Sequence, residues 1–173
     1  MNKSIFSVLF ALAVFFEAGA QVKKIELQAS GLTCSMCSKA INKALSPLPF
    51  VKEIKTDLNK NLFIITPKDS VFANPHDIRQ KVEEAGFSVA RLFIEMNVSE
   101  SQVQPDQQLE QNGYQLLYVG AAPRTLTGTV RLQFIDKGLV TAKEFKKFSG
   151  LTRSKWYKTG EAAGANRIYH VTL

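Results

Sequence analysis

The spacing of hydrophobic residues between residues 22 and 96 changes from a strand period to a helix period and back, twice. Residues 22–28 alternate apolar and polar side chains, as a strand with one buried face does. From Ser35 the apolar residues follow a helical stripe, which Pro47 ends because proline cannot continue a helix. This half of the segment therefore predicts a strand followed by a helix.

The rest of the segment predicts two more strands, a second helix and a last strand. Residues 50–57 and 62–66 have the composition of a β-hairpin. Asn74 followed by Pro75 is typical of a helix start, and residues 87–96 form the expected last strand. The order β-α-β-β-α-β predicts an α+β, ferredoxin-like domain with both helices on one face of a four-stranded sheet.

The N-terminal residues 1–20 have the features of a secretory signal peptide. Lys3 precedes an apolar run at residues 5–16, and residues 18–20 form a small-residue cleavage site. The run is shorter than the ~20 residues that a membrane-spanning helix needs. We expect a secreted or periplasmic protein that starts near Gln21 and has no stable membrane insertion after cleavage. An uncleaved N-terminal anchor is the alternative.

The chain beyond the domain at residues 21–96 divides by composition into a polar segment and a β-rich region. Residues 97–113 are rich in glutamine, which favours a linker because such a segment has little to bury. Residues 114–173 are expected to form a small, mostly-β domain of unknown function, with enough strands for an open barrel. The expected strands are 114–119, 127–135, 155–157 and 167–172, and the expected helix is 141–148.

The chain has two cysteines, Cys34 and Cys37, which are too few for a disulfide-stabilised scaffold. They must serve a site or form one local disulfide. Cys37 falls in the first turn of the expected helix, where the helix dipole stabilises a thiolate. Two thiolates suit Cu(I), Ag(I) or Hg(II), whereas Zn(II) normally takes four ligands. Residues 31–37 contain no His, Asp or Glu, so we expect Cu(I) first and Zn(II) last.

Three short motifs resemble those of heavy-metal-associated domains. Residues 31–37, GLTCSMC, are similar to the family's metal loop, G-M-T-C-x-x-C. Residues 48–51, LPFV, are similar to its L-P-G-V, and residues 84–87, EAGF, to its E-A-G-Y/F. The resemblance extends over about residues 22–96.

This resemblance implies that Cys34 and Cys37 are the metal ligands and that Phe87 packs near them. Members of the family serve as copper chaperones, as modules of metal-exporting ATPases and as periplasmic mercury-binding proteins. The sequence departs from the family at Leu32, where Met is usual, and Leu preserves the buried volume. It departs again at Met36, whose thioether is either an exposed side chain or a weak third ligand.

The expected function is therefore that of an exported protein that binds one Cu(I) and carries it to a partner. The partner would present a thiol pair, as a metal exporter or acceptor domain does. A periplasmic Hg(II)-binding or resistance protein is one alternative. A thiol-disulfide redox protein is another, although no Trp precedes Cys34 and no Pro separates it from Cys37.

Charge and histidines exclude some other functions. The net charge is +7, and residues 114–173 contain ten Lys/Arg against three Asp/Glu. Nucleic acid is not expected as a partner of an exported chain. We expect this basic region to contact an acidic protein or an anionic membrane surface, or to be a solvent-exposed face. His76 and His170 have no carboxylate at a telling spacing, and no catalytic motif is present, so no enzyme is expected.

Overall fold

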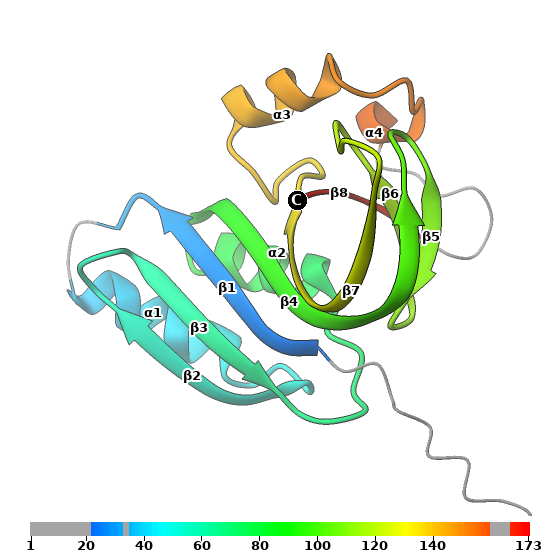
Figure 1. Cartoon of the computed structure of the whole chain (residues 1–173). Coiled ribbons are helices and arrows are strands. Elements are labelled where there is room, and N and C mark those ends of the chain that lie inside the picture. The colour runs from blue at the N-terminus through cyan, green and yellow to red at the C-terminus, as the bar shows by residue number, and fades with distance from the viewer. Residues whose placement is uncertain (1–21, 33–34, 160–166) are drawn as a thin grey trace, which may run out of the picture.

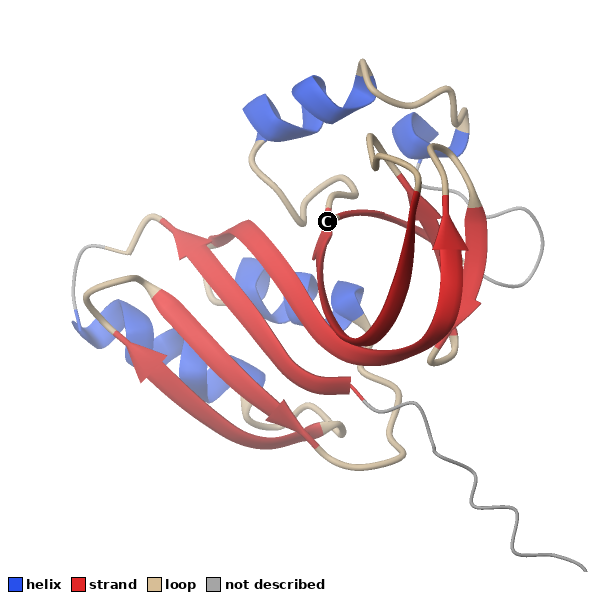
Figure 2. Cartoon of the chain, in the orientation of Figure 1, coloured by secondary structure: helices blue, strands red, loops and turns tan. Residues whose placement is uncertain are grey.

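The computed structural model describes residues 22–32, 35–159 and 167–173 (Figure 1). Its strands belong to one eight-stranded sheet with the order β2-β3-β1-β4-β7-β8-β6-β5. Figure 2 shows strands throughout the molecule, with helices at its outside. The elements in chain order are β1 (Val22–Ser30), α1 (Ser35–Leu45), β2 (Val51–Asp57), β3 (Leu62–Pro67), α2 (Pro75–Glu84), β4 (Ser88–Val103), β5 (Gln108–Gln111), β6 (Tyr114–Tyr118), β7 (Arg124–Phe134), α3 (Ala142–Ser149), α4 (Trp156–Thr159) and β8 (Ile168–Thr172).

The first half of the chain has the predicted ferredoxin-like arrangement. β1 lies between β3 and β4 and pairs with both in the antiparallel sense, while β2 pairs with β3. Ile25 and Leu27 of β1 are fully buried, as are Ile41 of α1 and Ile78 of α2. Figure 1 shows both helices on one face of this part of the sheet. The side chains of that face form the core beneath α1 and α2.

The start of α2 follows the sequence prediction closely. Asn74 is the N-cap, and its side-chain oxygen accepts a hydrogen bond of 3.0 Å from the backbone N–H of His76. Pro75 is the first helical residue, where its missing N–H costs nothing. Gly86 follows the helix with φ +87°, a conformation that glycine adopts without a side-chain penalty.

β4 continues seven residues beyond the predicted strand end, through residues 97–103. Val98 and Val103 are buried in this extension, whereas Ser99, Glu100 and Gln102 are exposed. The expectation of a linker is wrong for this segment, because its polar composition comes from the exposed face of a strand whose other face is buried. Ser101 is half-buried.

The second part of the expected linker forms β5 and a tight turn into β6. Asn112 and Gly113 have φ angles of +55° and +78°, the signs that a type I′ turn requires. Gln111 and Tyr114 are paired on either side of this turn. An Asn-Gly dipeptide favours this turn type, a signal that the linker interpretation of residues 97–113 overlooked.

The region after β4 is mostly β, as expected, and it extends the first sheet. Leu92 of β4 lies opposite Leu27 of β1 on one side and opposite Phe134 of β7 on the other. β8 pairs with β7 in the antiparallel sense and with β6 in the parallel sense. In Figure 1 the strongly bent β4 and β7 curl with β6 and β8 into a barrel-like shape. One hydrophobic cluster contains residues from Ile25 to Val171, so the core is continuous across both parts.

The predicted helix at 141–148 is confirmed by α3, which has Thr141 as its N-cap. The strand predicted at 155–157 is wrong, because Trp156 begins the short helix α4. Three residues are too few to distinguish a strand period from a helical one.

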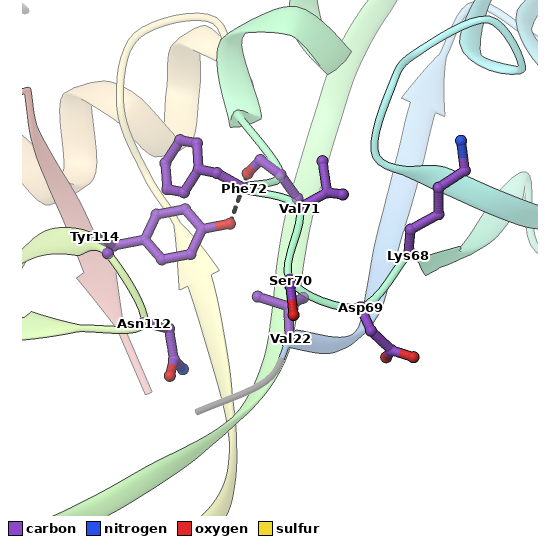
Figure 3. A pocket seen from close by; sticks show the side chains of 10 residues that line it. Val22, Lys68, Asp69, Ser70, Val71, Phe72, Asn112 and Tyr114 are labelled. Carbon is purple, nitrogen blue, oxygen red and sulfur yellow. Dashed lines mark hydrogen bonds between the residues drawn. The ribbon is translucent and has the colours of Figure 1, made fainter. Parts of the chain in front are cut away.

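Tyrosine side chains connect the β-rich region to the loop before α2. The Tyr114 hydroxyl donates a hydrogen bond of 2.6 Å to the backbone oxygen of Ala73, and its ring contacts Phe72 (Figure 3). Tyr169 donates a second one, of 3.1 Å, to the side-chain oxygen of Asn74. Burial raises the pKa of both phenols, so they stay protonated donors. A pocket of about 310 Å³ lies beside this connection.

We predict that residues 97–103 resist proteases and that a chain truncated after Met96 is less stable to urea than residues 22–173. Truncation removes the β7 partner of β4 and the buried Val98 and Val103. Limited proteolysis with mass spectrometry and urea unfolding test both points. Early cleavage within 97–113 that releases a fragment of unchanged stability would contradict a shared sheet.

Candidate metal centre

The candidate metal loop, residues 31–37 and called the metal loop below, begins where the β1–β4 ladder ends. Ser30 and Ser88 are the last paired residues, and their hydroxyl oxygens lie 2.6 Å apart. Gly31 follows with φ +84°, which a residue with a side chain rarely adopts. A Cβ on Gly31 would lie 3.9 Å from Cδ1 of Phe87. Phe87 therefore packs against the start of the loop, as the family resemblance implies.

Cys37 is the third residue of α1, and its side chain is half-buried. Backbone N–H groups in the first turn have no partner within the helix, and the helix dipole is positive there. No acidic residue lies in this turn to oppose a thiolate. The position favours the ionised form of Cys37, which is the form that binds soft metals.

Cys34, the other predicted ligand, lies with Thr33 outside the described residues. In the sequence it directly precedes Ser35, the first residue of α1. Leu32 is half-buried and packs against the core, which agrees with its expected role in place of Met. Met36 is 68% exposed and therefore does not contribute to the core.

No cluster of three or more His, Cys, Asp or Glu side chains occurs among the residues that the structure describes. His76 lies at the start of α2, partly buried and 5.9 Å from the Tyr169 ring between centroids. Burial lowers the pKa of His76 to about 4, and the charges of Arg167 and Arg79 contribute. His76 is therefore neutral at pH 7.

His170 has a carboxylate partner that its spacing in the sequence did not indicate. Its Nδ1 lies 2.8 Å from Oδ1 of Asp136, and its backbone N–H donates to Oδ2 of the same carboxylate at 3.0 Å. Its Nε2 lies 3.0 Å from Oγ of Ser154. His170 and Asp136 are 34 positions apart in the sequence, and the pairing of β7 with β8 brings them together.

The contacts run from serine to histidine to aspartate, as in a nucleophilic triad, which is recognised by geometry rather than by sequence position. Here His170 is 1% exposed and Asp136 is 2% exposed, so a substrate has no access to the imidazole. Tyr157 lies beside the imidazole and donates a hydrogen bond of 2.8 Å to the backbone oxygen of Ile135. We interpret the array as a buried cross-link that holds the α4 segment against β7 and β8.

We predict that Asp136→Ala lowers the free energy of unfolding by about 1–3 kcal/mol, the cost of leaving buried donors unsatisfied. Ser154→Ala, at a half-buried position, should cost less. Urea unfolding of both variants measures the difference. Covalent labelling of Ser154 by a fluorophosphonate in the folded wild type would contradict a purely structural array.

Comparisons with known proteins agree on the first half of the chain. The family model of the heavy-metal-associated domain matches residues 26–88. A probable copper-transporting ATPase of Arabidopsis thaliana, HMA5, is 32% identical over 89 residues, which are 51% of this chain and 9% of that protein. The copper-exporting P-type ATPase of Bacillus subtilis (strain 168) is 32% identical over 84 residues, which are 46% of this chain and 10% of that protein. The chain thus spans about a tenth of these relatives.

Among solved structures, the yeast copper transporter domain CCC2A, studied in apo and Cu(I)-loaded states, is 29% identical to this chain. It has a TM-score of 0.34, and the match covers 38% of this chain and 88% of that domain. A copper-binding domain from the P-type ATPase HMA7 is 28% identical, also with a TM-score of 0.34.

Proposed function

Residues 26–88 form a heavy-metal-associated domain, and from this premise we propose that the chain binds one Cu(I) ion through Cys34 and Cys37. The observation that carries the proposal is the position of Cys37 in the first turn of α1, beside a loop that starts at the Gly31–Phe87 contact. The copper-transporting relatives favour copper over other soft ions.

Two thiolates match the ion in softness and in coordination number. They carry a charge of −2, so Cu(I) leaves one negative charge on the site. Soft sulfur ligands favour Cu(I), and Ag(I) or Hg(II) would compete for the same pair. Zn(II) normally takes four ligands, two more than the pair supplies. We therefore expect reduced protein to retain Cu(I) and to release Zn(II).

We further propose that the chain carries the ion to a partner protein rather than acting as an enzyme. Met36 is largely exposed next to Cys37, so the start of α1 lies at the surface. A partner's thiolate could approach there and form a three-coordinate intermediate before the ion moves. The proposed setting is outside the cytoplasm, with residues 1–20 as the signal peptide. Among the described residues, no helix is long and apolar enough to span a membrane.

The test is a competition titration of the reduced chain against a Cu(I) chelator. We expect one Cu(I) per chain and a loss of more than about 100-fold in affinity for Cys34→Ser or Cys37→Ser, because even outer-shell changes cost about 10–100-fold. Met36→Ala is the matched control and should keep wild-type affinity. A double Cys34→Ser/Cys37→Ser variant that competes as well as wild type would disprove the proposal, and a loss in Met36→Ala would identify a third ligand.

A further inference from the structure

A groove of about 640 Å³ lies between the metal-loop end of the sheet and helix α3. Gln28 of β1 and Arg91 of β4 line its sheet side, and they are paired across the ladder. Their neighbours Leu27 and Leu92 are fully buried, so Gln28 and Arg91 point to the face of the sheet away from α1 and α2. The groove is therefore on the face that the two helices of the first half leave uncovered.

The other wall of the groove belongs to the region beyond the heavy-metal-associated domain. Lys143 and Lys147 line it and are exposed, and they lie one helical turn apart on α3. Glu144 also lines the groove, but its Oε1 accepts a hydrogen bond of 2.9 Å from Nε of Arg91. The described lining thus has three cations and one carboxylate, a net charge of +2, and the pairing of Arg91 with Glu144 leaves Lys143 and Lys147 as its excess charge.

Helix α3 is packed against the β-rich region, which fixes the backbone positions of its lysines beside the groove. The Phe145 ring stacks on the Tyr157 ring with centroids 4.6 Å apart, and Phe148 packs against the same cluster. The Arg91–Glu144 ion pair ties the helix to β4. The basic wall is therefore attached to the sheet that carries the metal loop.

The groove is close to the loop along the chain. Gln28 is three residues before Gly31, which corresponds to about 10 Å of strand. A protein that brings its thiols to the start of α1 would extend over this distance. The surface that it would cover next to the loop is cationic.

We propose that the groove is a docking surface for the metal acceptor, and that it fits a domain with carboxylates around its thiol pair. The inference rests on the proposed transfer of Cu(I). Opposite charges raise the rate of encounter and suppress wrong partners, and salt screens the effect. Helix α3 would thus give the chain a partner preference that the metal loop alone does not supply.

The experiment follows Cu(I) transfer from the loaded chain to an apo copper-exporter module with carboxylates around its thiols. Lys143→Glu/Lys147→Glu should slow transfer at least about tenfold at low salt, the lower end of electrostatic steering, and high salt should remove the difference. A module with those carboxylates changed to Lys should reverse the preference. Transfer to dithiothreitol, which carries no charge, should be unaffected.

The matched control is Lys52→Glu/Lys68→Glu, which changes the net charge equally. Lys52 and Lys68 are exposed near the start of β2 and the end of β3, at the sheet end away from the loop. Wild-type transfer by Lys143→Glu/Lys147→Glu, or equal slowing by the control, would overturn the docking surface. Chelator titration is run in parallel: a wild type that binds no Cu(I) would refute the proposed function, whereas intact binding with unchanged transfer refutes only the groove.

Discussion

The pairing of β4 with β1 on one edge and β7 on the other is the constraint on which the rest of the molecule depends. β4 has 16 residues, which is long enough to pair with strands of both parts of the sheet. In a four-stranded ferredoxin-like sheet this strand would be an edge with unpaired backbone groups. Here β7 pairs with that edge, so the region that follows β4 is held close to the heavy-metal-associated domain.

Two consequences follow for the metal loop. The β1–β4 ladder ends at Ser30 and Ser88, which fixes where Gly31 and Phe87 meet and where α1 begins. The pairing of β4 with β7 also brings α3 to the same end of the sheet, through the contact between Arg91 and Glu144. The end of the sheet where β1 stops thus has the start of α1 on one face and the basic helix α3 against the other.

The sequence predicted the first half well because its signals are local: strand alternation, the Asn74 cap and the loop motif each lie within a few residues. It failed at residues 97–103, whose polar composition predicts a linker although Val98 and Val103 form a buried face. The contact between His170 and Asp136 was out of reach, since it depends on how β7 and β8 pair. For the site, the family motif supplied Cys34 and Cys37, whereas Lys143 and Lys147 required the fold.

We propose that two sulfur atoms of this chain hold one Cu(I) ion, and copper K-edge X-ray absorption of the Cu(I)-loaded, reduced chain identifies the ligand atoms. We expect an edge typical of two-coordinate Cu(I) and a first shell of two sulfur scatterers. A shell that contains nitrogen or oxygen, or an edge that is unchanged in a Cys34→Ser/Cys37→Ser variant, would contradict it.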